Sequence, residues 1–341
     1  MRFGLDSANS GNHDDRECFP AQSSVLDEVA LLERIAVEYD IPVPRACVFF
    51  ARGDSDVYKV HTDGPTYYMK ICRPPHPLAW AESEARLVVD LAADGAPVSR
   101  AVRRRDGGFA TEITASEGRR PLLVFEEAQD GRLDSGEEGL FRRFGRAVGD
   151  LHDTMDRLSG SYDLQVLDWD WPARVLLPSG RRLIGEDDYE FLIGLCERMR
   201  SFFERFAREL PDFGLCHCDL VPVNVRCADG GALWFFDFGN AAFTWRAREL
   251  AVIQATLPCE RTPESRAKAW EAFLDGYGQV RALPLGTEKH LPAFALLQRV
   301  TWIARAMACC PLRMGTENFH PDWVRTLMPG VKELANRVLN A

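Results

Sequence analysis

The pattern of apolar residues changes near residue 128, and this change limits the architectures that the chain can adopt. Before it, short strand-like runs at 46–51, 56–61 and 66–72 are followed by a helical run at 79–93. After it, apolar residues recur almost everywhere at the three- and four-residue spacing of helices. Strands and one helix followed by a series of helices predict an α+β chain with a small mixed part and a larger helical part.

The same patterns predict the remaining elements and the division of the chain. A first helix is expected at 24–39, and further strands near 99–104 and 121–126. The predicted division is a flexible tail at 1–22, a mixed N-terminal lobe at 23–127 and a mostly helical C-terminal lobe at 128–341. Helices of the second lobe are expected at 138–157, 187–209, 263–277, 289–308 and 322–339.

Composition argues against several classes of protein. A formal net charge of −10 argues against nucleic acid as the main partner, because phosphate binding needs a basic face. No run of eighteen apolar residues is present, which argues against a transmembrane helix. The polar, acidic N-terminus lacks the apolar core of a secretory signal, so the ten cysteines are expected to be free thiols in the cytoplasm.

Chemically informative residues are concentrated between 215 and 239, where a turn-rich strand pair interrupts the helices. Asp219 and Asn224 are followed by Asp237, thirteen residues after the asparagine. Phosphoryl transfer needs a carboxylate that orients or deprotonates a hydroxyl, and Mg²⁺ prefers carboxylate and amide oxygens as ligands. The three residues supply one base and two such ligands, so the set predicts a phosphoryl-transfer site.

A zinc site is the competing interpretation of the run LCHCDLVPVNVRC at 215–227. Structural zinc usually draws on two separated pairs of ligands, and no second pair of Cys or His lies suitably downstream. In a strand, Cys216 and Cys218 would point to one face and His217 to the other. We therefore interpret the cysteines as small apolar filler and His217 as a hydrogen-bonded support for the loop.

The pattern His217-x-Asp219-x₄-Asn224 followed by Asp237-Phe238-Gly239 resembles the phosphotransferase superfamily of aminoglycoside phosphotransferases, choline kinases and type II homoserine kinases. The resemblance covers roughly residues 45–310. It implies a protein-kinase-like bilobal fold, with a small antiparallel sheet and one helix in a nucleotide-binding N-lobe and a mostly helical C-lobe. It also implies that Asp219 is the catalytic base and that Asn224 and Asp237 hold magnesium.

The resemblance further implies a lysine that anchors ATP and a helix glutamate that pairs with it. Lys70, on the strand at 66–72, and Glu84, in the helix at 79–93, have the expected order and spacing. Glu82 faces elsewhere, because two residues correspond to about 200° around a helix. Taken singly, each would be read as a solvated surface side chain.

Two weaker expectations concern the nucleotide. The phosphate loop is expected at 52–56, where Ser55 would offer its hydroxyl and backbone N–H, although an ordinary hairpin turn accounts for the same residues. The adenine edge is expected against main-chain groups from Glu126 to Ala128, at the hinge between the lobes.

The chain departs from the family pattern at several positions near the site. Cys218 stands where glycine is common, and Pro222 and Val223 stand where histidine and glycine are common. Asn240 ends an Asp-Phe-Gly-Asn run where many relatives have Asp-Phe-Asp-Asp, and Glu249 replaces a frequent aspartate. None of these changes removes the base or a primary metal ligand, but they leave the rigidity of the loop and the substrate class open.

The acceptor pocket is expected in the helical lobe, with Asp168 and Asp170 as candidate substrate residues. Carboxylates alternating with tryptophans in DWDW suit an ammonium-bearing substrate through charge and cation–π contact. The alternative is a helix N-terminus, in which acidic residues favour the first turn and the tryptophans anchor it.

These observations predict an ATP- and Mg²⁺-dependent kinase that phosphorylates a hydroxyl of a small molecule. The acceptor is expected to be an amino acid or amino alcohol such as homoserine, or an aminoglycoside-type antibiotic. A stress-response type of protein Ser/Thr kinase and a non-catalytic nucleotide-binding pseudokinase are the alternatives. No nucleic-acid or membrane partner is expected, and no oligomeric state is predicted.

Overall fold

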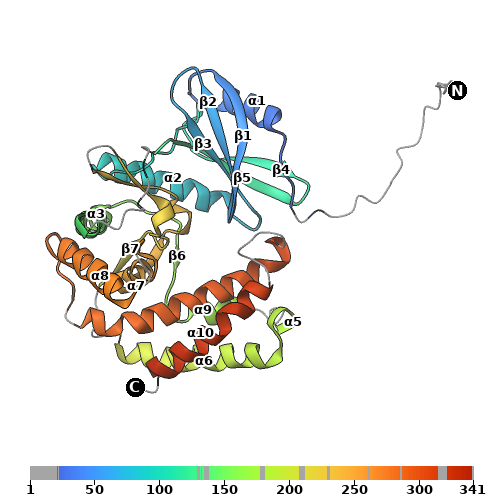
Figure 1. The fold of residues 1–341 in the computed structure, drawn as a ribbon. Coiled ribbons are helices and arrows are strands. Elements are labelled where there is room, and N and C mark those ends of the chain that lie inside the picture. Colours follow the sequence, from blue (N-terminus) through green and yellow to red (C-terminus); the bar gives the residue numbers. More distant parts are fainter. Residues whose placement is uncertain are drawn as a thin grey trace, which may run out of the picture.

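The structure is a computed structural model of the 341-residue chain. It describes residues 21, 23–128, 131, 133, 138–176, 181–206, 212–228, 231–259, 262–284, 286–313 and 321–339. The tail predicted at 1–22 lies almost entirely outside these residues. We use N-lobe for the elements α1 to β5 and C-lobe for the elements α3 to α10. The N-lobe lies above the C-lobe in Figure 1. The boundary at 127/128 stays a prediction.

A single antiparallel sheet forms the centre of the N-lobe. Its strand order is β1-β2-β3-β5-β4, and every neighbouring pair is antiparallel. Alternate side chains of the central strands enter the core, as the period of two predicts. The strands are β1 (Pro44–Arg52), β2 (Ser55–Thr62), β3 (Tyr67–Cys72), β4 (Thr111–Ala115) and β5 (Gly118–Glu126).

One of the predicted N-lobe strands was wrong. Residues 99–104 form only isolated bridges, from Ala101 to Phe125 and from Arg104 to Tyr39. The fifth strand is instead β4, which pairs with β5 at the edge of the sheet. Its sequence, TEITA, has a single large apolar residue because an edge strand has little to bury, so apolar content did not reveal it.

Two helices flank this sheet. Helix α1 (Glu28–Glu38) buries Leu31 and Ile35, and Asp27 caps its first turn by accepting the Ala30 N–H at 2.8 Å. Helix α2 (Leu78–Ala93) is followed by Gly95, which has a left-handed φ of 89°. Glu84 is one of the few charged residues that helix α2 buries.

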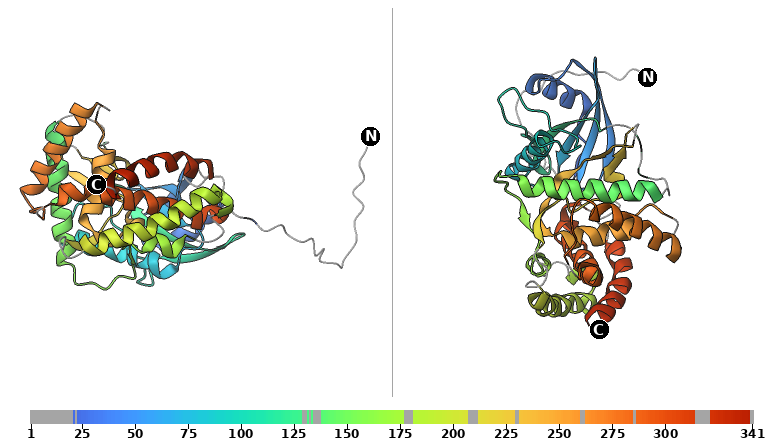
Figure 2. Two further views of the ribbon diagram at one scale, coloured as in Figure 1. Left: turned by 90° about the horizontal axis from the view of Figure 1, so that it is seen from below. Right: turned by 90° about the vertical axis from the view of Figure 1, so that its left-hand side faces the viewer.

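Helices make up most of the C-lobe, as predicted. Helix α3 crosses beneath the sheet in the right-hand view of Figure 2, and it packs closely on α8. Gly145 and Gly276 permit this approach, since a Cβ at either would lie 1.9 Å from a carbonyl oxygen of the other helix. The helices are α3 (Glu138–Arg157), α4 (Trp171–Val175), α5 (Arg181–Ile184), α6 (Glu186–Phe206), α7 (Arg246–Thr256), α8 (Pro263–Gly278), α9 (Thr287–Arg313) and α10 (Pro321–Leu339).

Short strands and turns interrupt these helices and face the N-lobe. Strand β10 pairs in parallel with β6 and antiparallel with β7, while β8 and β9 form a separate hairpin. The loop at 217–221 therefore follows β7, and the turn at 236–241 connects β9 to β10. The elements are β6 (Gln165–Val166), β7 (Phe213–Cys216), η2 (Pro222–Asn224), β8 (Val225–Cys227), β9 (Leu233–Phe235), η3 (Phe238–Asn240) and β10 (Ala242–Trp245).

The described helices are not suited to crossing a bilayer. None of them combines the length and the apolar character that a membrane crossing requires. The longest, α9, has 27 residues but includes charged side chains such as Arg299 and Arg305. The cytoplasmic location predicted above is not tested by this result and stays a prediction.

Candidate active site

The loop that begins at His217 follows directly on the end of β7. His217 is fully buried, and its Nε2 donates to the carbonyl oxygen of Phe236 at 3.0 Å. Its Nδ1 accepts the N–H of Asp219 at 3.3 Å, which is consistent with a neutral ring. Burial lowers the pKa of His217, so the ring stays neutral as it links the two loops. Its position is that of the support expected from the sequence.

Cys218, which directly precedes Asp219, adopts a left-handed backbone conformation with φ of 64°. This conformation costs a residue with a Cβ about 1–2 kcal/mol, whereas glycine adopts it freely. The left-handed conformation explains why glycine is common at this position and why Cys218 is a departure from the family pattern. The Cys218 N–H donates to the carboxylate of Glu249 at 2.5 Å, which holds the strained peptide in place.

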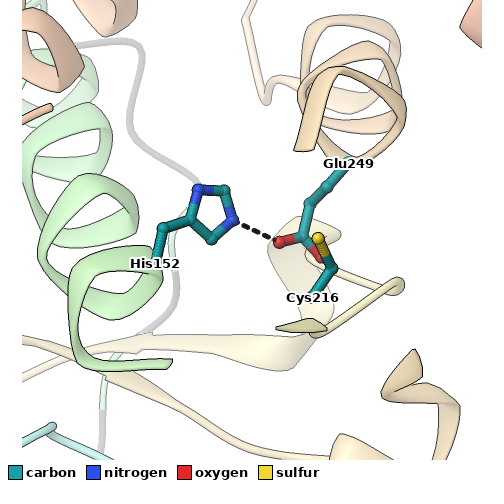
Figure 3. Close-up of side chains that lie close together, drawn as sticks. All are labelled: His152, Cys216 and Glu249. Carbon is teal, nitrogen blue, oxygen red and sulfur yellow. Dashed lines mark hydrogen bonds and ion pairs between the residues drawn. The ribbon is translucent and has the colours of Figure 1, made fainter. Parts of the chain in front are cut away.

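The carboxylate of Glu249 is itself held by buried His152, which in turn contacts Tyr277. His152, on α3, contacts the Glu249 carboxylate through Nε2 at 2.7 Å and the Tyr277 hydroxyl through Nδ1 at 2.9 Å. Figure 3 shows His152 and Glu249 approaching from different helices, beside the end of the strand that carries Cys216. His152, Cys216 and Glu249 have the composition of a metal site, but the 2.7 Å contact is a hydrogen-bond distance and leaves no room for an ion between its atoms. We interpret this network as a brace for the loop.

Asp219 lines a pocket, and one of its carboxylate oxygens already accepts hydrogen bonds. Asn224 donates from Nδ2 to Oδ2 of Asp219 at 3.0 Å, and Asn240 donates to the same oxygen at 3.4 Å. No described residue is recorded donating to Oδ1, which leaves that oxygen for a ligand. Burial and the nearby Asp237 charge raise the pKa of Asp219 to about 7.

Lys70 joins the two lobes through a pair of carboxylates. Its Nζ lies 2.7 Å from Oε1 of Glu84 on α2 and 2.8 Å from Oδ1 of Asp237 in the C-lobe. Burial alone lowers the pKa of Lys70, but Asp237 and Glu84 outweigh it and hold that pKa well above its ordinary value. Lys70 lowers the pKa of Asp237 in return. The pairing of Lys70 with Glu84 is the one that the family resemblance implied.

Gly239 makes this arrangement possible. A Cβ at position 239 would lie 2.3 Å from Nζ of Lys70 and 3.3 Å from Oε2 of Glu84. Asp237, two residues earlier, has a left-handed φ of 63° and a side chain that is 46% exposed. The backbone thus turns sharply at Asp237 and directs its carboxylate to Lys70, and the backbone at Gly239 passes close to the ammonium group of Lys70.

The expected phosphate loop is a tight turn between β1 and β2. Gly53 N–H donates to the carbonyl of Ser55 at 2.9 Å, and Ser55 opens β2 with its side chain half-buried. Asp54, at the tip, pairs with Arg305 of helix α9 at 2.8 Å. The turn therefore lies over the cleft and contacts the C-lobe.

The two hinge residues expected to contact adenine differ in what their backbones offer. Glu126 N–H donates to the carbonyl of Arg100 at 2.8 Å, and its carbonyl accepts the Ser99 hydroxyl. Ala128 lies beyond the strand, and no hydrogen bond from its backbone to another described residue is recorded. Of the two, Ala128 is better placed to bind a ligand through its main chain.

The pocket over Asp219 lies between α2, the 238–242 segment and helices α7 and α9. The predicted substrate residues Asp168 and Asp170 are not among the residues that line it. Asp168 pairs with Arg174 at 2.9 Å, and Asp170 pairs with Arg200 at 2.6 Å. Asp170 is the N-cap residue of α4, which agrees with the alternative interpretation of DWDW as a helix start.

With this geometry, the chain can be compared with known proteins. A model of the family described as "Phosphotransferase enzyme family" matches residues 46–283. The chain belongs to this family. One relative, an uncharacterized protein of Synechocystis sp., is 29% identical over 290 residues, which is 81% of this chain and 77% of the relative.

Solved structures of low sequence identity share the fold of this phosphotransferase. An amicoumacin kinase, in complex with AMP-PNP and Ca²⁺, gives a TM-score of 0.71 at 20% identity, covering 92% of this chain and 94% of that one. A microcompartment-associated aminopropanol kinase also gives 0.71 at 20% identity, covering 92% and 98%. These results confirm the predicted superfamily, the protein-kinase-like α+β fold and the assignment as a phosphotransferase.

The oxygen donors of the phosphotransferase fit a hard divalent cation. Asn224 uses its amide nitrogen toward Asp219, so its carbonyl oxygen remains a donor. Asp237 has one oxygen on Lys70 and a half-exposed carboxylate. Oxygen ligands of this kind suit Mg²⁺, whereas the thiol of Cys218, next to Asp219, has its pKa raised to about 12 by burial and by Glu249.

Sequence patterns missed two arginines of the pocket. Arg248 on α7 and Arg305 on α9 both line it, and Arg305 contacts the side-chain oxygen of Asn240. Asn240, noted before only as a departure, thus connects Arg305 to Asp219. Helical periodicity could have placed both arginines on buried faces, but no short motif marks them.

Proposed function

We propose that this phosphotransferase uses ATP and Mg²⁺ to transfer the γ-phosphoryl group to a hydroxyl of a small molecule. The observation that carries the proposal is the contact of Lys70 with both Glu84 and Asp237, beside a pocket that Asp219 lines. A lysine paired with a helix glutamate and a metal-binding aspartate is the arrangement with which protein kinases transfer a phosphoryl group.

The residues of the N-lobe bind and orient the nucleotide. Lys70 binds the α- and β-phosphates, and Glu84 fixes the direction of the lysine through the 2.7 Å contact. Ser55 contributes its hydroxyl and N–H from the turn over the cleft. Ala128 offers its main-chain groups to the adenine edge, while Glu126 serves mainly as the end of the strand, because its backbone groups already have partners.

The residues of the C-lobe hold the metal and the acceptor. Asn224 and Asp237 would hold Mg²⁺. The bound ion would neutralise the charge of the phosphates and stabilise the negative charge that develops during transfer. Asp219 accepts a hydrogen bond from the acceptor hydroxyl through Oδ1 and orients it for attack. The buried brace of Glu249 and His152 keeps the loop that bears Asp219 in position. Most of the rate enhancement then comes from positioning and charge neutralisation.

The names of the structural relatives support a small-molecule acceptor. One is called an amicoumacin kinase and another an aminopropanol kinase, so both are kinases named for small molecules. The pocket of this chain is lined by side chains of both lobes, among them Trp80, Trp171 and Trp302. A concave pocket with apolar side chains and a few polar groups is the usual form of a small-molecule site.

The nucleotide part of the proposal is tested by calorimetric titration of AMP-PNP with Mg²⁺ and with EDTA. We expect Mg²⁺-dependent binding, and a loss of affinity of about 10-fold or more, equivalent to ~1.4 kcal/mol, in both Lys70→Met and Asp237→Asn. Lys268→Met, which changes an exposed lysine on α8, is the control and should bind as the wild type does. Equal affinity with and without Mg²⁺ would contradict the metal assignment.

The transfer part is tested with γ-labelled ATP and a panel of amino acids, amino alcohols, aminoglycosides and nucleosides. We expect labelled product with at least one hydroxyl-bearing small molecule. Binding of AMP-PNP without transfer to any acceptor would favour a pseudokinase, and labelling of protein substrates alone would favour a protein kinase.

A further inference from the structure

Two neighbouring arginines of α7 are equally buried but differ in how their charges are compensated. Arg246 and Arg248 are 1% and 2% exposed, respectively. Arg246 forms ion pairs with Asp156 and Asp212. No ion pair joins Arg248 to a carboxylate among the described residues. The charge of Arg246 is therefore compensated by carboxylates of the protein, whereas that of Arg248 is not compensated by any described carboxylate in an ion pair.

The contacts of Arg248 are all to neutral oxygens. Its Nε donates to Oε1 of Gln298 at 2.5 Å, and its Nη1 donates to the carbonyl of Leu167 at 3.1 Å. A guanidinium has five N–H donors in a planar fork, so these two bonds leave several donors for another group. Asp168, the carboxylate that favours the charge of Arg248 at longer range, is already paired with Arg174.

A buried guanidinium without a counter-ion is expensive. Removing one ion from water costs several kcal/mol in a protein interior unless an opposite charge compensates it. Burial, with Arg305 as a further contribution, lowers the pKa of Arg248. Arg246 shows that this helix can meet such a charge with protein carboxylates, so the missing partner of Arg248 calls for an explanation.

Arg248 lines the same pocket as Asp219. Gln298 and Thr301 of α9 lie on the same wall, and the second cation there, Arg305, is paired with Asp54. A ligand that reaches Asp219 from this pocket can thus reach the unpaired guanidinium. Since the catalytic carboxylate needs a hydroxyl, a second group on the same molecule is what Arg248 would bind.

We propose that the acceptor carries a carboxylate as well as the hydroxyl, and that Arg248 binds this carboxylate. The inference rests on the proposed function and narrows its substrate class to hydroxy acids, including hydroxy amino acids. The planar fork of arginine matches a carboxylate with two parallel hydrogen bonds, which fixes orientation as well as charge. Binding supplies the counter-ion that the described residues of the protein lack.

The test uses acceptors in pairs that differ only by the carboxylate. Suitable pairs are L-serine with ethanolamine, L-homoserine with 3-aminopropan-1-ol, and glycerate with ethylene glycol. We expect at least one acid to have a kcat/KM more than 10-fold above that of its partner. The inference is overturned if the partners without a carboxylate are phosphorylated as well as the acids, or if no acid is phosphorylated and none binds the wild-type protein in calorimetry.

Variants of Arg248 separate a binding role from a structural one. Arg248→Gln should raise the KM for the preferred acid about 30-fold or more, with a smaller change in kcat and an unchanged Kd for AMP-PNP. Arg248→Lys, which keeps the charge but loses the fork, should recover part of the affinity. Arg200→Gln changes an exposed arginine that pairs with Asp170 outside the pocket, and it should leave KM unchanged.

Other outcomes of this series identify which assignment fails. An unchanged KM in a destabilised Arg248→Gln protein would show a structural arginine and overturn the inference. A weaker Kd for AMP-PNP in that variant would place Arg248 at the nucleotide phosphates and overturn it too. Failure of the wild-type protein to bind AMP-PNP with Mg²⁺ would instead contradict the proposed function itself.

Discussion

The N-lobe and the cleft each contain a cluster of buried charges, and the clusters are built differently. In the N-lobe sheet, Asp56 accepts from Arg73 at 2.8 Å and from Arg120 at 2.7 Å, and Arg120 also pairs with Glu117 at 3.0 Å. Both carboxylate oxygens of Asp56 thus face a cation. In the cleft, by contrast, one oxygen of Asp219 and most of the donors of Arg248 have no recorded partner among the described residues.

Backbone conformation follows the same division. The two non-glycine residues with a left-handed backbone in the described chain, Cys218 and Asp237, both lie in the cleft loops. Strained backbone and uncompensated charge are costs that a fold accepts where a ligand is bound, whereas the sheet network is complete without one. The comparison therefore predicts that changes in the sheet cluster affect stability, while changes in the cleft affect activity.

The largest effect is expected for Asp219→Asn, which removes the carboxylate of the proposed base and keeps the shape of the side chain. Loss of a positioned base typically lowers rates by about 10²–10⁴-fold, and AMP-PNP affinity should stay near that of the wild type. Steady-state kinetics and calorimetry measure the two quantities. Asp40→Asn, at a position with an 84% exposed side chain in the N-lobe, is the control. Turnover near the wild-type rate in the Asp219 variant would remove the assigned base.

Asp56→Asn should have its effect on stability instead. It leaves buried Arg73 without its counter-ion and buried Arg120 with Glu117 alone, and breaking a buried ion pair typically costs about 3–5 kcal/mol of unfolding free energy. Asp63→Asn breaks an exposed pair with Arg45 and should change the unfolding free energy far less. Urea denaturation measures both variants. Similar losses in the two would show that the buried network is no more important than a surface pair.

The contribution of Asp56 should also depend on pH in a defined direction. Burial alone would raise the pKa of Asp56, but its hydrogen bonds to Arg73 and Arg120 hold that pKa below the ordinary value. A lowered pKa stabilises the fold fully above the unfolded value of about 4, and the stabilisation is lost as pH falls further. The stability difference between wild type and Asp56→Asn should therefore be constant from pH 6 to 8 and shrink below about pH 4. A difference that grows on acidification would contradict this origin.

Gly239→Ala should weaken nucleotide binding through a steric effect. The new Cβ would lie 2.3 Å from Nζ of Lys70, so the lysine must leave at least one of its two carboxylates. We expect an AMP-PNP affinity about 10-fold lower, equivalent to ~1.4 kcal/mol, in a protein that remains folded. Gly194→Ala, at a helical glycine with open space around its Cβ, is the matched control. Equal affinities for the two variants would show that Lys70 adapts without loss.

The smallest effect is expected at Cys218. Glycine removes the strain of the left-handed backbone but loses more entropy on folding, so Cys218→Gly should change stability by less than about 1 kcal/mol. Cys218→Val places a β-branched side chain in the same conformation and should be destabilised by about 1–3 kcal/mol. Chemical denaturation compares the two. A valine variant as stable as the wild type would show that the loop relaxes out of this conformation.

Much of the fold could be predicted because long amphipathic segments report their own burial. The helix predicted at 138–157 is α3 (Glu138–Arg157), and the helix expected at 79–93 is α2 (Leu78–Ala93). Prediction failed at β4 and at the two-residue β6, because short edge strands bury too few residues to show a period. Their existence depends on a partner strand supplied by another part of the chain.

The candidate site shows the same difference between residues that are close in sequence and residues that are close only in space. Asp219, Asn224 and Asp237 were predicted together because they lie on neighbouring loops of one short segment, and the structure brings them to one cleft. Asp168 and Asp170 were predicted from their chemistry alone, and the structure pairs both with arginines that no local pattern indicated. Their roles as ligands, like those of the other site residues, await experiment.

The sequence by itself determined the order of the long helices, the family, and the candidates for base, lysine anchor and metal ligands. These depend on periodicity and on short spacings along the chain. The tertiary structure alone decided which charges are compensated. Arg246 and Arg248 are two residues apart and chemically identical, yet Asp156 and Asp212 reach only the first. Ion pairing depends on distance in space, and folding brings together carboxylates and arginines that are far apart in sequence.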